Sequence, residues 1–369
     1  MSSSPRSRAG DRLRVGLVGL GSMGRNHLRV LTARDDVRVA AVADPDAASL
    51  SAAATATGAQ SFAEPLAMIA EEELDAVVVA APTTAHLPIA LAAIERGVPL
   101  LVEKPLAASA IEGQLIVVAA RERGVPVQVG HVERFNPAVL ELGRLLEQGW
   151  LSTVYAIASR RAGPFPARIR DVGVTVDLAT HDVDILSWVV GERPERVYAQ
   201  TARRIHADHE DLLFGLLHFP SGATGMLDVN WLTPAKRRQL VVVGEEGMFE
   251  LDYLTQRLTF TRASDLTNPK LIRGFAPTFE GDVIDLPVAS TEPLAAEIDA
   301  FIEVVRTGSR PVVDAEDGLW AVATAGALLS AANEHREIEL GELGELAGLS
   351  RLAPRPATPI PTAHESGTR

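Results

Sequence analysis

The sequence predicts an α/β fold in which a Rossmann domain with a doubly wound parallel sheet comes first and a strand-rich second domain follows. From Arg14 to Gly130, short apolar runs alternate with alanine-rich helical stretches, which is the pattern of βαβ units. After Trp150, strand-like runs follow one another with turn residues between them. A chain of 369 residues is also too long for one small core, so two domains are expected.

The first half contains candidate strands and helices in alternation. The strands are residues 14–18, 37–43, 76–81, 99–103 and 126–130, and the helices are residues 24–33, 47–57, 65–72, 86–96 and 109–123. Gly58, Gly97 and Gly124 stand where these helices should end, as glycines at helix C-termini do.

The second half contains candidate strands at residues 153–159, 196–201, 212–219, 223–231, 239–243 and 248–251. Pro220, Ser221 and Gly222 predict a hairpin turn between two of them. Alternating side-chain polarity from Thr153 to Ala158 fits an antiparallel sheet with one buried face. Residues 293–307 and 316–334 predict two closing helices.

The composition excludes several classes of function. A formal charge of -13 argues against broad binding to nucleic acid or to anionic membranes. The absence of cysteine excludes disulfides, thiolate catalysis and cysteine-ligated zinc. The chain shows no signal-peptide core and no apolar stretch near the roughly 20 residues that span a bilayer. We therefore expect a cytoplasmic protein that binds neither nucleic acid nor membrane.

A glycine motif follows the first strand and opens the first helix, which is the context of a dinucleotide fingerprint. Its six residues are Gly19, Leu20, Gly21, Ser22, Met23 and Gly24. The first glycine permits a tight turn, the second lets the backbone approach the pyrophosphate, and the third allows close packing of helix and strand. The helix N-terminus then faces the phosphates.

Asp44 ends the second strand, at about the distance from the glycine motif that the fingerprint requires. A carboxylate there accepts hydrogen bonds from the ribose hydroxyl and repels a 2′-phosphate. No arginine is adjacent, so we expect NAD as the cofactor and consider NADP the weaker alternative.

Two further loops leave the carboxyl ends of strands, where ligands bind in open α/β sheets. The first carries Pro82, Thr83 and His86. His86 can contact the cofactor or cap the next helix, and the sequence leaves both open. The second loop carries Glu103 and Lys104, followed by Pro105. The Lys104 ammonium can hydrogen-bond the nicotinamide ribose and stabilise the oxygen of a substrate hydroxyl as hydride leaves.

A helix predicted from Asp177 to Trp188 carries a carboxylate and an imidazole four residues apart, at Asp177 and His181. An imidazole with a pKa near 6.5 can accept a hydroxyl proton near neutral pH. Asp177 can orient that ring or bind a second hydroxyl. The pair lacks a third well-spaced ligand, so we expect no metal site.

Together these residues resemble the glucose–fructose oxidoreductase / inositol dehydrogenase / rhizopine catabolism (Gfo/Idh/MocA) family over roughly residues 13–340. The most specific part of the resemblance is Glu103-Lys104-Pro105, followed farther along the chain by Asp177 and His181. The resemblance implies a C-terminal α+β domain with a large, open-faced, mainly antiparallel sheet. It also implies that Lys104, Asp177 and His181 form the catalytic group.

The resemblance divides the chain into four parts. We expect a disordered start at residues 1–12, an NAD(P)-binding Rossmann domain at 13–130, a substrate-binding and oligomerisation domain at 131–345, and a disordered proline-rich tail at 346–369. The uncovered face of the large sheet predicts a homo-oligomer, a dimer or a tetramer.

Residues 130–139 and 174–182 look most like family members that oxidise the 3-hydroxyl of UDP-N-acetylglucosamine or a related sugar nucleotide. The predicted substrate contacts are Arg134, Arg161, Arg168, Asp177 and His181. The arginines are included because arginine suits bidentate binding of a diphosphate, and Asp177 and His181 because they can meet the substrate hydroxyls. Arg161 and Arg168 fit a solvated loop equally well. An inositol or free-sugar dehydrogenase, an enzyme with permanently bound cofactor and a non-catalytic dinucleotide-dependent regulator remain alternatives.

Overall fold

The computed structural model describes residues 12–166, 172–263 and 281–341, which form two compact units. The first unit runs up to Phe135 and takes in Thr291–Ala327, and the second comprises Asn136–Ser290 and the chain from Leu328 onward. The expected disordered tail and nearly all of the expected disordered start lie outside the described residues. We expected the first domain to end at residue 130. The first unit instead extends to Phe135, and it also contains Thr291–Ala327 from a later part of the chain.

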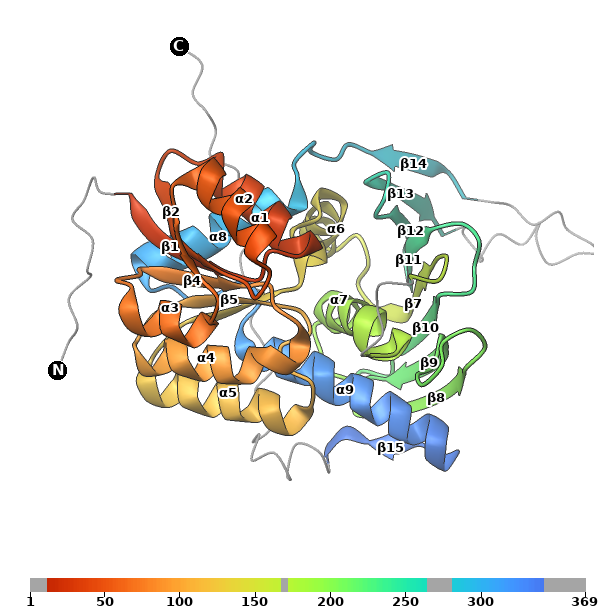
Figure 1. The fold of residues 1–369 in the computed structure, drawn as a ribbon. Helices are drawn as coiled ribbons and strands as arrows, with labels where there is room; N and C mark the ends of the chain where they lie inside the picture. Colours follow the sequence, from red (N-terminus) through yellow and green to blue (C-terminus); the bar gives the residue numbers. More distant parts are fainter. Residues whose placement is uncertain (1–11, 167–171, 264–280, 342–369) are drawn as a thin grey trace, which may run out of the picture. The chain divides into compact units, whose positions relative to one another are not determined.

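The first unit contains the predicted parallel sheet, in the strand order β3-β2-β1-β4-β5-β6 (Figure 1). Its strands are β1 (Leu13–Val18), β2 (Val37–Ala43), β3 (Gln60–Phe62), β4 (Ala76–Val79), β5 (Leu100–Glu103) and β6 (Val127–Gly130). Its helices are α1 (Ser22–Thr32), α2 (Ala47–Thr57), α3 (Pro65–Glu71), α4 (His86–Glu95), α5 (Ala110–Arg123) and α8 (Pro293–Thr307), with short turns η1 (Thr83–Ala85) and η2 (Val132–Phe135).

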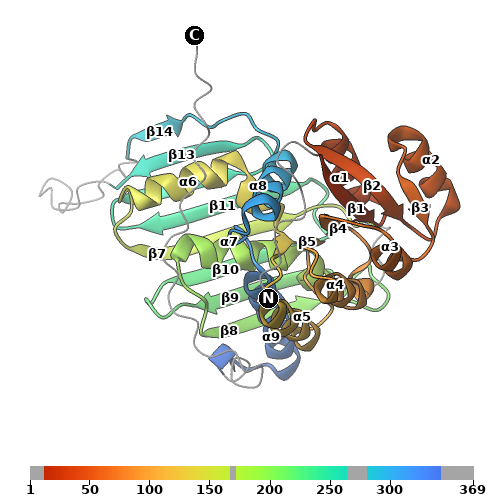
Figure 2. The same ribbon diagram turned by 90° about the vertical axis from the view of Figure 1, so that its left-hand side faces the viewer.

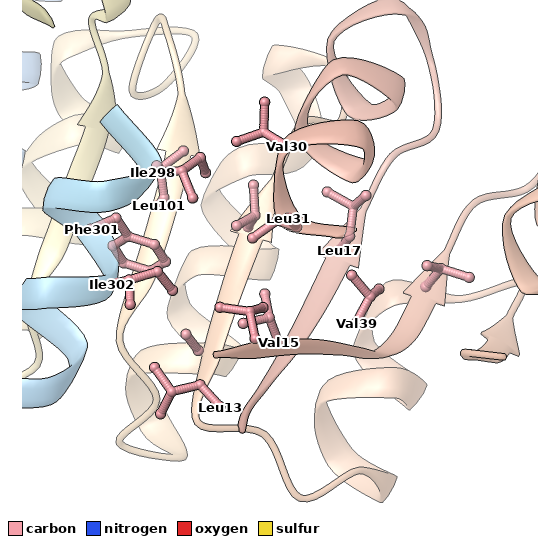
Figure 3. Close-up of a cluster of buried hydrophobic side chains, with 14 of the residues drawn as sticks. Leu13, Val15, Leu17, Val30, Leu31, Val39, Leu101, Ile298, Phe301 and Ile302 are labelled. Atoms are coloured by element: carbon pink, nitrogen blue, oxygen red, sulfur yellow. The ribbon is translucent and has the colours of Figure 1, made fainter. Parts of the chain in front are cut away.

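An apolar core lies between this sheet and the helices α1 and α8 (Figure 3). Val15 of β1 and Leu101 of β5 supply the sheet side, and Leu31 of α1 is fully buried against them. Phe301 and Ile298 of α8 complete the cluster, and neither is exposed to solvent. Helix α8, which comes much later in the chain than the strands of this sheet, therefore seals the face that α1 begins to cover.

The second unit contains a mixed sheet in the order β14-β13-β12-β11-β7-β10-β9-β8-β15, in which β7 and β10 pair in parallel and the other neighbouring strands pair antiparallel. Its strands are β7 (Val154–Ala162), β8 (Arg196–Ala202), β9 (Leu212–His218), β10 (Thr224–Asn230), β11 (Arg237–Gly244), β12 (Gly247–Asp252), β13 (Arg257–Arg262), β14 (Val283–Leu286) and β15 (Ile338–Glu339). The predicted hairpin at Gly222 joins β9 to β10.

Helices α6 (Pro137–Glu147) and α7 (Thr180–Val190) lie across one face of this sheet (Figure 2). Gly143 of α6 faces the indole of Trp188 of α7, and a Cβ at Gly143 would lie 2.4 Å from it. Helix α9 (Ala315–Glu334) begins in the first unit and ends in the second. Among the described residues, no helix combines the length and apolar character needed to cross a membrane.

We expect Gly143→Ala to destabilise the protein, because an added methyl group would overlap the Trp188 ring and overpacking costs about 1–3 kcal/mol. Gly326→Ala is the matched control, because this exposed glycine in α9 has no atom within 4 Å of an added Cβ. Alanine favours a helix interior over glycine by about 1 kcal/mol. Urea unfolding should therefore show a lower midpoint for Gly143→Ala and an equal or higher one for Gly326→Ala. Equal midpoints would contradict the packing.

Candidate functional site

The carboxyl ends of the parallel strands collect the residues predicted to bind a dinucleotide. Gly19 follows β1, Asp44 follows β2, and Pro82 comes just beyond β4. Glu103 ends β5 and Lys104 follows it. Because parallel strands end at one edge of a sheet, these residues form one rim of the first unit, as the fingerprint predicts.

The three motif glycines differ in what surrounds them. Gly19 has a φ of +85°, and a Cβ there would lie 2.5 Å from the carbonyl oxygen of Ala80. A Cβ on Gly24 would lie 1.9 Å from the carbonyl oxygen of Gly19. Gly21, by contrast, has no atom within 4 Å of an added Cβ. Two glycines are thus required by the turn itself, and Gly21 leaves open the space that a pyrophosphate needs.

The beginning of α1 is suited to receive phosphate. Gly21 is its N-cap and supplies no side-chain hydrogen bond, so the first backbone N–H groups have no side-chain cap. Ser22 and Met23 follow in the first turn and are exposed. The residues present therefore fit a dinucleotide at this helix N-terminus.

Asp44 stands beside the glycine turn. Its Oδ2 atom accepts a hydrogen bond of 2.6 Å from the Leu20 backbone nitrogen, and its Oδ1 atom accepts one of 2.8 Å from the Asp46 nitrogen. A carboxylate offers about four acceptor positions, so capacity remains for a ribose hydroxyl. Asp44 thus holds the turn and can also meet the sugar.

His86 is buried between two of the strand-end loops. Its Nδ1 atom lies 2.9 Å from the Pro105 carbonyl oxygen, and its Nε2 atom lies 3.0 Å from the Ala81 carbonyl oxygen. Burial lowers the pKa of His86, so the neutral ring donates to one of these carbonyls. The sequence left open whether His86 contacts the cofactor or caps the next helix. In the structure its ring instead links the Ala81 loop to the Lys104–Pro105 corner. Pro82 and Thr83 lie at the start of η1 in that loop.

Glu103 and Lys104 form a corner at the end of β5, and the Glu103 side chain holds the backbone of this corner. The Glu103 Oε1 atom lies 2.7 Å from Nε2 of His27, and its Oε2 atom accepts a 3.1 Å hydrogen bond from the Lys104 backbone nitrogen. Both His27 and Glu103 are buried. Neither His27 nor its partnership with Glu103 was expected from the sequence.

In the second unit, Asp177 and His181 lie where two kinds of helix meet. Asp177 belongs to a π-helical turn, η3 (Thr175–Ala179), and His181 lies in the first turn of α7. The prediction of one regular helix from Asp177 was therefore wrong, since the wider π-turn changes the spacing between turns. His181 is 9% exposed and Asp177 is half-buried, so neither belongs to a solvated face.

Glu210 fixes the start of this helical segment. Its carbonyl oxygen accepts a hydrogen bond from the Val174 nitrogen, and its carboxylate accepts one from the Thr175 nitrogen. A Cβ at Gly173 would lie 2.1 Å from that carboxylate, so a larger residue at this position would displace the Glu210 side chain. The strand-end loop before β9 thus anchors the segment that carries Asp177.

Arg161 is the buried partner of Asp182, the residue after His181. Its Nε atom lies 2.9 Å from Oδ2 of Asp182, and the Ser159 hydroxyl donates to Oδ1 of the same carboxylate at 2.7 Å. The Arg161 guanidinium also lies over the Tyr253 ring, 5.3 Å from its centre. Because Arg161 is 4% exposed, it is not the open phosphate-binding side chain that we expected.

The remaining predicted residues are distributed between the units. Arg134 is buried in η2 of the first unit, and Arg168 lies outside the described residues. Lys104 belongs to the first unit, whereas Asp177 and His181 belong to the second. Among the described residues, a cluster with the spacing of metal ligands forms within the first unit, at His27, Glu103 and Glu297.

Two parts of the chain match known protein families. Residues 13–131 match the oxidoreductase family with an NAD-binding Rossmann fold, and residues 139–250 match the GFO/IDH/MocA C-terminal domain. The chain belongs to the GFO/IDH/MocA oxidoreductase family. The predicted fold class and family are confirmed, and the protein is an NAD-binding dehydrogenase that acts on CH–OH groups.

The relatives differ in substrate. Inositol 2-dehydrogenase 2 from Saccharopolyspora erythraea is 33% identical over 363 residues, which are 95% of this chain and 99% of the relative. UDP-N-acetylglucosamine 3-dehydrogenase from Acidithiobacillus ferrooxidans is 27% identical over 81% of this chain and 90% of its own. The WlbA dehydrogenase from Bordetella pertussis, solved with NADH and UDP-GlcNAcA, is 25% identical with a TM-score of 0.78, covering 90% of this chain and 98% of its own.

We expect Asp182→Asn to cost about 3–5 kcal/mol of unfolding free energy, because it removes the charge that pairs with the buried Arg161 guanidinium at 2.9 Å. Asp228→Asn is the matched control: its partner Arg160 is the neighbouring residue of β7 but is 52% exposed, and exposed pairs contribute about 0–1 kcal/mol. Urea unfolding of both variants measures the difference. A similar small loss in both would show that the Arg161 pair is not a structural anchor.

Proposed function

We propose that this protein uses NAD to oxidise a secondary ring hydroxyl of a sugar or cyclic polyol. The observation that carries the proposal is the common rim on which the glycine turn, Asp44 and Lys104 meet, because it supports a cofactor site and an ammonium at the same sheet edge. The two dehydrogenase relatives named above act on molecules of this class.

In the proposed reaction, His181 accepts the proton of the substrate hydroxyl, and Asp177 orients the substrate or the ring. Lys104 donates a hydrogen bond to the same oxygen and stabilises the negative charge that develops there. The glycine turn and Asp44 would hold NAD, which would supply the acceptor for the hydride that leaves the carbon. Proton transfer by a positioned side chain contributes about 10²–10⁴-fold to a rate, so His181 and Lys104 are the residues on which turnover should depend.

Two substrates are the leading candidates. The sequence motifs around residues 130–139 and 174–182 favour the 3-hydroxyl of a UDP-N-acetylhexosamine, with Arg134 and Arg168 as its proposed contacts. Two observations favour inositol as the second candidate: the 33% identity to an inositol dehydrogenase over nearly the whole chain, and the engagement of Arg161 with Asp182 instead of an open site.

The deciding experiment measures nicotinamide absorbance with UDP-N-acetylglucosamine, its uronate, glucose and myo-inositol, each with NAD and NADP, and identifies the keto product by mass spectrometry. We expect a product two hydrogens lighter from one ring alcohol, with NAD preferred. His181→Ala should lower turnover at least 10²-fold and leave NAD affinity nearly unchanged. His335→Asn is the control, because His335 is exposed and asparagine tolerates its φ of 53°. Unaltered turnover in His181→Ala would remove His181 from the mechanism.

We also propose that a second copy of the chain covers the outer face of the large sheet. Neighbouring strands place large apolar side chains on that face, and Phe214, Leu216 and Met226 are 41–51% exposed. Leu216 and Met226 are directly paired across β9 and β10. An apolar patch of this kind marks an interface. Light scattering should give the mass of a dimer or tetramer, and the mass of one chain would contradict the proposal.

A further inference from the structure

Three ionisable side chains from distant parts of the chain meet inside the first unit, next to the Lys104 corner. His27 comes from α1, Glu103 from the end of β5, and Glu297 from α8. Their candidate ligand atoms all lie within 4.8 Å of one another, and all three side chains are buried. Glu297 has no part in the proposed cofactor or catalytic site, so its burial beside His27 and Glu103 has another cause.

The hydrogen bonds of the two carboxyl groups are very different. Both oxygens of Glu103 are used, one by His27 and the other by the Lys104 backbone nitrogen. Neither oxygen of Glu297 has a hydrogen-bond partner among the described residues, although both are inaccessible to solvent. The Nδ1 atom of His27 is likewise inaccessible to solvent and has no hydrogen-bond partner among the described residues. An ionised carboxylate with no donor would be very costly in such a place.

The pKa values of the two carboxyl groups shift in opposite directions. Burial alone would raise the pKa of Glu103, but the hydrogen bond with His27, together with the charges of His27 and Lys104, outweighs burial and lowers that pKa. Burial first and the Glu103 charge second raise the pKa of Glu297 well above its ordinary value. Two like charges this close cannot both persist in a dry site, so one carboxyl group keeps a proton.

Other charged groups near α8 have assignments of their own. Arg29 of α1 pairs with Glu292, the N-cap residue of α8, and Arg34, which follows α1, pairs with the exposed Asp299 of α8. The turn η2, which packs on α8, carries Glu133 and Arg134 and follows His131. The Glu297 backbone carbonyl accepts a hydrogen bond from the Gln128 side chain, which holds the helix against β6.

We propose that His27, Glu103 and Glu297 form a buried one-proton site, in which the two carboxyl groups hold one proton between them: Glu297 stays a neutral carboxylic acid and Glu103 an ionised one, and this division positions Lys104. The hydroxyl of neutral Glu297 can donate toward Glu103, whose carboxylate holds the Lys104 backbone. Glu297 is thus a positioning residue, since it acts through Glu103. The last step rests on the proposed function of Lys104, but the protonation state does not.

The protonation state is tested on the full chain by infrared spectroscopy at neutral pH. The protein with ¹³C-labelled glutamate should show the carbonyl stretch of a neutral carboxylic acid, shifted by the label and missing from Glu297→Gln. The absence of any neutral glutamate band in the labelled wild-type protein would overturn the proposal, and this result needs no variant. One tightly held divalent metal ion per chain, lost in Glu297→Gln, would also overturn it.

The same assignment predicts a pH dependence of stability. The folded protein keeps a proton on Glu297, whereas the unfolded chain loses it near the ordinary value of 4.5. Stability therefore falls as pH rises above that value, by up to about tenfold in the unfolding equilibrium constant per pH unit, until the folded acid also ionises. Glu297→Gln cannot titrate, so this part of the fall should disappear. An unchanged slope would show that Glu297 is already ionised.

The positioning role has a kinetic test. Glutamine keeps the size and a donor, so Glu297→Gln should retain kcat within about twofold, whereas Glu297→Leu should lower kcat about tenfold with little change in the KM for NAD. Rescue by glutamine separates positioning from mere stability. Equal kcat in both variants would overturn the positioning role. If no substrate is turned over by any form, the proposed function fails while the infrared result still decides the one-proton site.

Discussion

The buried hydrogen bond between His27 and Glu103 is the constraint on which the candidate cofactor rim depends. It joins the helix that follows the glycine turn to the end of β5, two elements that are far apart in the chain. The same carboxylate then holds the backbone of Lys104. His86 holds the next residue from the other side through the Pro105 carbonyl. The lysine therefore leaves a corner that is fixed on both flanks, which limits where its flexible side chain can begin.

The second unit contains a similar arrangement. In the first unit the buried carboxylate, Glu103, precedes Lys104, whereas in the second unit the buried carboxylate, Asp182, follows His181. His181 is followed directly by Asp182, and that carboxylate is held by Arg161 and Ser159 inside the unit. In both units, then, the residue proposed to handle the substrate hydroxyl is covalently next to a buried, multiply bonded carboxylate. A side chain whose neighbour is locked loses less freedom when it meets a substrate, which is how a supporting group contributes to a site without touching it.

The sequence predicted the regular parts of the fold because each signal is local. Helix α2 has the predicted bounds, and the strand ends agree within a few positions because apolar runs are bounded by glycine and proline. The short strand β3 was missed because it is an edge strand with two exposed residues. Helix α6 was missed although Asn136 and Pro137 mark its start. The glycine roles followed from the motif, but Arg161 was read as a loop cation because nothing local shows that Asp182 is its partner.

Glu297 lay beyond sequence reasoning for a physical reason. It lies on a helix with the ordinary alternation of apolar and polar residues, and the neighbouring Glu103 belongs to a strand of the first half of the chain. A lone glutamate in such a helix is expected to face solvent, yet this one is fully buried. Burying an acid lowers stability relative to a leucine of similar size, so packing alone gives no reason to keep it. Its place within 4.8 Å of the carboxylate that holds Lys104 offers a reason, because the neutral acid proposed there would add a hydrogen-bond donor without adding a second negative charge.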